Sequence, residues 1–177
     1  GDGLDQLGGQ IFQRHQRLDI LVHAAGLLGG LTPVSHIAPK VWDRVVATNL
    51  TSAYRLIRSF EPLLRQSEAG RAIFFTTGRV VRPKAYWGAY AATKAGLESL
   101  VRCWADEIET TNIRAVLLDP NVMRTKMRAE AFPGEDPETL TDPAEIRPMI
   151  LDLVTRKDLG LPDKPVLFSE WKETAAA

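Results

Sequence analysis

The sequence has 177 residues, of which 45% are hydrophobic and 25% charged, and its 22 basic and 22 acidic side chains give a formal net charge of zero. These proportions are typical of one globular domain, and the neutral balance argues against nucleic acid or an anionic membrane as a partner. No apolar run reaches membrane-spanning length, and the single Cys103 cannot form an internal disulfide. We therefore expect a cytoplasmic protein in which Cys103 is a packed helix residue.

The N-terminal part of the chain predicts a helix followed by a buried strand. Apolar residues at helical spacing between positions 1 and 16 indicate an amphipathic helix, whose glycine pair lacks the spacing of a phosphate-binding loop. The apolar run 18–22 is typical of a buried strand and is followed directly by His23-Ala24-Ala25-Gly26. Small residues at the end of a strand allow a ligand to approach the backbone, although a tight turn would use the same residues.

Residues 39–64 carry apolar side chains at helical spacing and predict one long helix, with Pro39 in its first turn. Asn49 and Thr51 interrupt the apolar stripe. Because asparagine is a poor helix former, Asn49 either faces solvent or makes polar contacts inside the protein.

Two further strands, 72–75 and 113–118, flank a predicted helix over 88–109. Strands and helices that alternate with short turns indicate right-handed βαβ units in a parallel sheet, so the expected fold class is α/β. After residue 121 the sequence predicts a short basic helix over 123–131, a polar loop over 132–137, a helix beginning near Pro143 and a last strand over 165–168. Residues 172–177 resemble the start of a peptide tag, so they are not expected to belong to the fold.

A pair of residues in helix 88–109 and a hydroxyl before it suggest acid–base chemistry. Tyr90 and Lys94 are four residues apart and share one helix face, and Thr77 lies at the end of the preceding strand. An ammonium group near a phenol favours the phenolate, so Tyr90 could exchange a proton with an alcohol oxygen near neutral pH. Taken alone, the pair would also fit an ordinary contact on a helix surface.

The order and spacing of several motifs between Leu4 and Phe168 resemble the short-chain dehydrogenase/reductase family of Y-x-x-x-K type. Residues 18–26 are similar to the family's D-I-L-V-N-N-A-G, and residues 120–125 are similar to its P-G-x-x-x-T. Asn49 occupies the place of a helix asparagine, and Thr77 precedes Tyr90 by thirteen residues, where the family has a catalytic serine. The loop A-F-P-G-E-D-P resembles a bacterial subgroup of the family.

The resemblance implies a Rossmann-like, doubly wound parallel sheet and an enzyme that interconverts a small alcohol and a carbonyl compound with NAD or NADP. Tyr90 would be the general acid or base, Lys94 would support the phenolate and bind the nicotinamide ribose, and Thr77 would orient the carbonyl. Asn49 would anchor a water that returns a proton to Tyr90. The residues implied to line the cofactor are Ala25, Gly26, Asn49, Tyr90, Lys94, Pro120, Asn121, Val122 and Thr125. No metal is expected.

Three departures from the family pattern bear on this interpretation. Thr77 adds a methyl group beside the substrate oxygen, and Asn121 stands where the family has a glycine next to the nicotinamide. The family's opening half, whose G-x-x-x-G-x-G turn holds the pyrophosphate and which selects NAD or NADP, is not in these residues. We therefore expect residues 1–170 to form strands 4 to 7 of a three-layer α/β/α domain within a longer polypeptide, and residues 171–177 to be a tail. Without its family neighbour, strand 19–22 would be an exposed edge.

Two other functions fit the same residues. The fold could serve as a cofactor-free oligomerisation or regulatory module, or Tyr90 and Lys94 could serve an epimerase or dehydratase that recycles its cofactor.

Loops 26–37, 80–87 and 123–137 are predicted to build the substrate pocket. The aromatic residues Tyr86, Trp87 and Phe132 in these loops indicate either an apolar or aromatic substrate or ordinary packing.

Helices 39–64 and 88–109 are expected to join copies of the chain. Their apolar residues exceed what one sheet-facing stripe accommodates: Leu56, Phe60, Leu97, Leu100, Val101 and Trp104. Together with the two-fold contact that the resemblance implies, this predicts a homodimer or homotetramer. Packing of the same residues beneath the loops of a monomer is the alternative.

Overall fold

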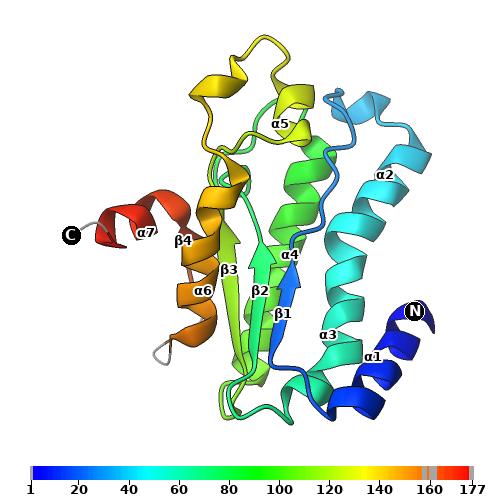
Figure 1. Cartoon of the computed structure of the whole chain (residues 1–177). Helices are drawn as coiled ribbons and strands as arrows, with labels where there is room; N and C mark the ends of the chain where they lie inside the picture. Colours follow the sequence, from blue (N-terminus) through cyan, green and yellow to red (C-terminus); the bar gives the residue numbers. More distant parts are fainter. Residues whose placement is uncertain (1, 157–158, 160–162, 176–177) are drawn as a thin grey trace.

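The computed structural model describes residues 2–156, 159 and 163–175. A parallel sheet at its centre has the strand order β1 (Ile20–His23), β2 (Arg71–Phe75), β3 (Arg114–Asp119) and β4 (Val166–Leu167) (Figure 1). Because Leu21 lies beside Ala72 and Ala72 beside Ala115 in parallel register, the carboxyl ends of these strands meet at one edge of the sheet. The predicted parallel α/β sheet is confirmed.

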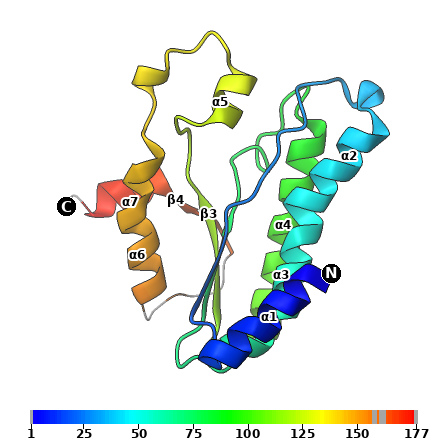
Figure 2. The ribbon, with the colours of Figure 1, turned by 45° about the vertical axis from the view of Figure 1, so that its right-hand side comes forward.

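Helices cover both faces of this sheet and give the three layers expected from the sequence (Figure 2). One face carries α1 (Asp2–His15), α3 (Ser52–Leu64) and α4 (Gly88–Glu107), with α2 (Pro39–Val46) leading into α3, and the other carries α6 (Arg147–Thr155) and α7 (Phe168–Ala175). The connections contain α5 (Lys126–Ala131) and the 3-10 turns η1 (Val34–His36), η3 (Pro137–Thr139) and η4 (Pro143–Ile146). Within the described residues, no helix is long and apolar enough to cross a membrane.

Alternate residues of the central strands supply two hydrophobic cores. Phe74 and Leu117 belong to the core shared with α3 and α4, whereas Ile73 and Leu118 pack with Met149 of α6 on the opposite face. Successive strand residues face opposite sides of a sheet, so a sheet covered on both sides needs apolar residues at nearly every position. This is why the strands appear in the sequence as unbroken apolar runs.

Several elements differ from the prediction. The short helix begins at residue 126 rather than 123, and the 3-10 turn η4 precedes α6 where one helix was expected from Pro143. The long helix 39–64 is interrupted by a π-helical turn, η2 (Ala47–Thr51), which contains Asn49. The last strand is shorter than the predicted 165–168, because Phe168 already begins α7. This helix also continues past the expected start of the tail at residue 171.

Strand β1 lies at the edge of the described sheet and is covered on one face only. Leu21 and His23 are buried, whereas Ile20 and Val22 are 44% and 42% exposed. Apolar side chains beside unpaired backbone groups form the exposed edge that the sequence predicts for residues 19–22.

The expectation that the apolar residues of the two long helices cannot all face inward is wrong. All of them are buried in, or packed against, one core: Leu56, Phe60, Leu97, Leu100, Val101 and Trp104. Residues of α1, α3 and α4 share this core, so each helix buries side chains against its neighbours as well as against the strands. Cys103, in contrast, is exposed and not packed.

Candidate active site

A cavity of about 550 Å³ lies at the carboxyl edge of the sheet. It is lined by residues that follow three neighbouring strands, among them Gly26 after β1, Thr77 after β2 and Pro120 after β3. Eight of the site residues expected from the sequence line it: Gly26, Thr77, Tyr90, Lys94, Pro120, Asn121, Val122 and Thr125. Ala25 is exposed and is not part of the lining, and Asn49 is fully buried next to Gly26.

Tyr90 stands in the first turn of α4, with its hydroxyl in hydrogen-bonding reach of the Thr77 side chain. Burial raises the pKa of Tyr90, the hydrogen bond with Thr77 lowers it in part, and the charge of Asp119 raises it again. Tyr90 therefore keeps its proton at neutral pH, as a proton donor must. The expected lowering of the Tyr90 pKa by Lys94 is not observed: burial is the largest influence on this pKa, and Lys94 is not among the groups that shift it.

The two threonines that follow β2 have different surroundings. Thr76 is buried, and its Oγ1 donates to Oε1 of the buried Glu98 at 2.5 Å. Thr77 is half-buried, and although both threonines line the cavity, it is the Thr77 hydroxyl that lies beside Tyr90. Thr77 is therefore the hydroxyl of the pair that a substrate oxygen can reach.

Lys94 lies one turn along α4 from Tyr90, and its Nζ donates to the carbonyl oxygen of Phe75 at 2.7 Å. Only 3% of Lys94 is exposed, and burial lowers its pKa to about 8. The ammonium group is therefore mostly charged at neutral pH. A Cβ on Gly26 would lie 3.7 Å from Nζ, so any side chain at this position would narrow the space in front of the ammonium.

The side chain of Asn49 holds the loop that follows β1. Its Oδ1 accepts from the Leu27 amide at 2.7 Å, and its Nδ2 donates to the Leu27 carbonyl at 2.9 Å and to Thr93 Oγ1 at 3.0 Å. Of the two predicted alternatives, Asn49 thus makes polar contacts inside the protein. Both Nδ2 hydrogens are used, so the amide cannot also donate to the water that the resemblance implies. Asn49 positions Gly26 and Leu27 against α4.

Asn121 adopts the backbone conformation that a glycine would otherwise supply. Its φ is 58°, in the left-handed region that asparagine tolerates better than most residues. Its Oδ1 accepts from the backbone amide of Ser169 at 2.7 Å, which satisfies an amide in the first turn of α7. The asparagine thus links the loop after β3 to the last helix, which a glycine could not do.

Asp119 also belongs to the site, although the sequence analysis did not select it. It is buried at the end of β3, lines the cavity and accepts hydrogen bonds from the backbone amides of Asn121, at 2.8 Å, and Gly78. Burial raises the pKa of Asp119, these two hydrogen bonds lower it, and the charge of Glu98 raises it. The carboxyl group therefore joins the loops after β2 and β3. A charged residue that ends an apolar strand is the sequence signal that could have identified it.

The predicted substrate loops 26–37, 80–87 and 123–137 all contribute residues to the cavity lining, but their aromatic residues contribute unequally. Trp87 is buried and lines the cavity, whereas Tyr86 is 56% exposed and Phe132 packs against Trp87 with ring centres 6.0 Å apart. Neither Tyr86 nor Phe132 is part of the lining. Arg79 and Arg82 also line the cavity. Arg82 belongs to the predicted substrate loop 80–87, but neither arginine was expected as a site residue. Spacing gave no signal for them, because they lie in an irregular loop.

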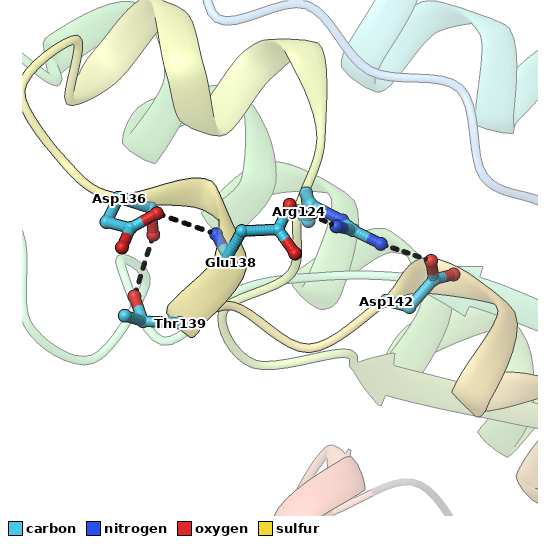
Figure 3. A network of polar contacts seen from close by, with 5 residues as sticks. All are labelled: Arg124, Asp136, Glu138, Thr139 and Asp142. Carbon is cyan, nitrogen blue, oxygen red and sulfur yellow. Dashed lines mark hydrogen bonds and ion pairs between the residues drawn. The ribbon is translucent and has the colours of Figure 1, made fainter.

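A network of polar contacts fastens the segment that carries α5 (Figure 3). Arg124 pairs with Glu138 Oε1 at 3.0 Å and with Asp142 Oδ2 at 2.7 Å, and its backbone amide donates to the Thr141 carbonyl at 2.9 Å. Asp136 accepts from the Glu138 amide at 3.0 Å. Because Arg124 and Asp142 lie at the two ends of this segment, the network closes it into a loop. Exposed ion pairs are individually weak, so the loop depends on several of them together.

His23 ends β1 and is only 3% exposed. Its Nε2 lies 2.7 Å from Ser52 Oγ, and since that hydroxyl donates to the Thr48 carbonyl, Nε2 is the donor. Its buried Nδ1 has no hydrogen-bond partner among the described residues. Burial, and after it the positive charge of Lys94, lowers the pKa of His23 to about 4.

Acid should destabilise the protein through His23. The unfolded chain binds a proton near the ordinary pKa of 6.5 and the folded chain only near 4, so the free energy of unfolding falls as pH falls between these values. The loss should reach up to about 3 kcal/mol. Urea unfolding at neutral pH and near pH 4 measures it. His23→Asn should reduce the acid-induced loss, whereas the exposed His36→Asn should keep it. Equal losses in wild type and His23→Asn would contradict this assignment.

Comparison with known proteins gives a consistent family likeness. Residues 2–136 match the family described as short chain dehydrogenase. The uncharacterized oxidoreductase YciK of Escherichia coli K12 is 39% identical over 163 residues, which make up 90% of this chain and 64% of YciK.

Two solved structures are also similar. A short chain dehydrogenase from Salmonella enterica serovar Typhi has 37% identity and a TM-score of 0.83, over 86% of this chain and 63% of that one. A short chain dehydrogenase from Escherichia coli CFT073, solved with NADPH, has 38% identity and a TM-score of 0.82, over 86% of this chain and 63% of that one. This chain thus spans slightly less than two thirds of the length of each of these relatives.

Proposed function

Since the chain belongs to the short-chain dehydrogenase/reductase family, we propose that it carries the catalytic part of an NADP(H)-dependent oxidoreductase that reduces a carbonyl compound to an alcohol. The observation that carries the proposal is the placement of a buried, protonated Tyr90 beside Thr77 and Lys94 in one cavity. We favour NADP(H) over NAD because the similar structure from E. coli CFT073 contains NADPH.

The residues at the strand ends fit the nicotinamide end of such a cofactor. Ala24 and Gly26 present a surface without large side chains, and the ammonium of Lys94 has hydrogens beyond the one bound to Phe75 with which to bind ribose hydroxyls. The segment from Pro120 to Val122 would contact the nicotinamide. When bound, the nicotinamide supplies the hydride.

The chain's own residues supply the proton and the orientation. Thr77 donates a hydrogen bond to the carbonyl oxygen and holds it next to the Tyr90 hydroxyl, which donates its proton to that oxygen. The ammonium of Lys94 stabilises the phenolate that remains on Tyr90. Asp119 opposes phenolate formation and so keeps Tyr90 protonated between turnovers.

An NADPH oxidation assay with a panel of aldehydes and ketones tests the proposal. Stoichiometric loss of NADPH with formation of an alcohol is the expected result. Substrate conversion without net loss of NADPH would instead favour an epimerase or dehydratase, because those reactions recycle the cofactor. A chain that binds no nicotinamide cofactor would favour the cofactor-free module.

Thr77→Ala should lower the turnover number by about 100-fold, because one hydrogen-bond donor to the reacting oxygen is lost. Thr77→Ser keeps the hydroxyl and should stay within a few-fold of the wild-type rate. Thr110→Ala, which changes an exposed threonine away from the cavity, is the matched control. Steady-state kinetics on the three variants decides the point. Full activity in Thr77→Ala would show that Thr77 does not hold the substrate oxygen.

We further propose that two copies of the chain associate through α4 and α3. The residues first expected to form this interface are internal, but the outward face of α4 includes four small exposed side chains: Ala92, Ala95, Ser99 and Cys103. Tyr54 on α3 is 51% exposed. Small residues allow two helices to approach closely, and the family resemblance implies a two-fold contact at these helices.

Light scattering at micromolar concentration should give the mass of a dimer or tetramer. The substitution Ala95→Arg should shift the mass to that of a monomer, since it places a charge in the proposed contact. Ala69→Arg, at an exposed alanine in the loop before β2, should leave the mass unchanged. A monomeric wild type, or an oligomer that persists in Ala95→Arg, would refute this interface.

A further inference from the structure

We propose that the substrate of this cavity carries an anionic group, a carboxylate or a phosphate, which binds Arg79 and Arg82. The inference rests on the proposed function, because it assigns a substrate class to the same cavity. Both arginines line the cavity, and they come from the loop after β2 that also contains Thr77.

The cavity lining carries more positive than negative charge, although the whole chain is neutral. Its basic side chains are Arg79, Arg82, Lys94 and Arg128, and its acidic side chain is Asp119. Arg128 is neutralised by Glu135, to which it donates two hydrogen bonds of 2.5 Å each. In this pair the guanidinium group of Arg128 binds both oxygens of one carboxylate, which is the geometry expected for an arginine and an anionic ligand.

Arg79 and Arg82 have no such partner. Within the described residues neither forms an ion pair, and Nη1 of Arg79 makes only a long contact of 3.5 Å with the Arg82 carbonyl. A guanidinium group presents several N–H donors in a planar fork that matches carboxylate and phosphate oxygens. Two of them on one cavity wall therefore favour an anionic ligand.

The loop holds Arg79 in a defined position relative to the reacting groups. Two backbone hydrogen bonds, of 3.1 and 2.9 Å, fold residues 77–82 into consecutive turns. The guanidinium carbon of Arg79 lies 5.0 Å from the ring centre of Trp87, and the ring of Trp87 contacts the ring of Tyr90 with centres 5.9 Å apart. Such preorganisation reduces the entropy lost on binding.

The remaining wall suits an apolar body between the anionic group and the carbonyl. Its apolar side chains include Met127, Ala131 and Ile146, together with Trp87. The substrate class is therefore a carbonyl compound with an apolar body and a carboxylate or phosphate group.

Isothermal titration calorimetry tests this inference with three ketones of similar body: benzoylpropionate, its neutral methyl ester and phenacyl phosphate. Titrations are run with and without NADP⁺, which cannot reduce a ketone, so binding is measured without turnover. Wild type should bind at least one of the two anions about 10-fold or more tightly than the ester. The double variant Arg79→Gln/Arg82→Gln should lose this preference and keep its affinity for the ester. The control Arg55→Gln/Arg58→Gln, which removes two exposed arginines of α3, should keep the preference.

Comparing the affinities for benzoylpropionate and phenacyl phosphate shows whether the site prefers a carboxylate or a phosphate. The inference is overturned if wild type binds the ester as tightly as both anions, or if the double variant loses acid and ester binding alike. It is also overturned if the double variant weakens NADP⁺ binding and leaves the anion preference intact, since the arginines would then serve the cofactor. Thermal unfolding verifies that the double variant is folded. If it is not folded, the titrations are run on Arg79→Gln and Arg82→Gln separately. Selective anion binding by a protein that oxidises no NADPH would support this inference and contradict only the proposed reaction.

Discussion

Tyr90→Phe is expected to lower the turnover number by about 10²–10⁴-fold, the usual contribution of a general acid, while folding and NADP(H) binding survive. The substitution removes one oxygen atom and leaves the packing of the ring against Trp87 in place. In the reductive reaction the carbonyl oxygen then lacks its proton donor, because Lys94 is bound to the Phe75 carbonyl and Thr77 is too weak an acid.

NADPH oxidation and cofactor titration, measured on the same preparation, test this expectation. Tyr54→Phe, which changes an exposed tyrosine on α3, is the matched control and should retain the wild-type rate. If Tyr90→Phe kept more than about a tenth of that rate, Tyr90 would not be the proton donor. The cofactor titration separates two causes of a low rate in Tyr90→Phe. Loss of turnover with normal NADP(H) binding supports the proton-donor role of Tyr90, whereas loss of both would mean that the substitution disturbs the cofactor site.

Asn49→Ala should lower the free energy of unfolding by about 2–4 kcal/mol. The substitution leaves the amide and the carbonyl of Leu27 without their partner and removes a donor to Thr93 in a fully buried place. Unsatisfied buried polar groups are among the few causes of so large an effect of one side chain. The loop containing Gly26 should loosen as well, so cofactor affinity should fall with stability.

Urea unfolding measures the effect, with Asn112→Ala as the control. Asn112 is exposed, and its side chain donates to the Ser67 carbonyl. A single hydrogen bond donated by an exposed side chain should contribute about 1 kcal/mol or less. Similar losses in the two variants would mean that water replaces the Asn49 amide, and that this side chain does not hold the loop after β1.

The strand-end residues of the site could be predicted from the sequence because they follow from local patterns. Gly26, Thr77 and Pro120 each follow an apolar run, and a parallel sheet brings the ends of its strands to one edge. Tyr90 and Lys94 are one helical turn apart, so their common face was evident from their spacing. The three layers of the fold followed from the same alternation of strands and helices.

The features that the sequence did not reveal depend on contacts between distant segments. The raised pKa of Tyr90 comes from burial, which the spacing to Lys94 does not indicate. The hydrogen bond from Ser169 to Asn121 joins residues 48 positions apart. The inward packing of Leu100 depends on which neighbouring helix covers it, whereas the sequence shows only that one side of a helix is apolar.

The exposed thiol on α4 offers a direct measurement of assembly. Cys103 is the only cysteine among the 177 residues, so a maleimide or nitroxide reagent attaches at one known position without any mutagenesis. In a two-fold pair formed through α4, the two labels would lie across the symmetry axis, and dipolar spectroscopy would yield one distance between copies. The rate of alkylation would fall as the protein concentration rises, because association covers the sulfur.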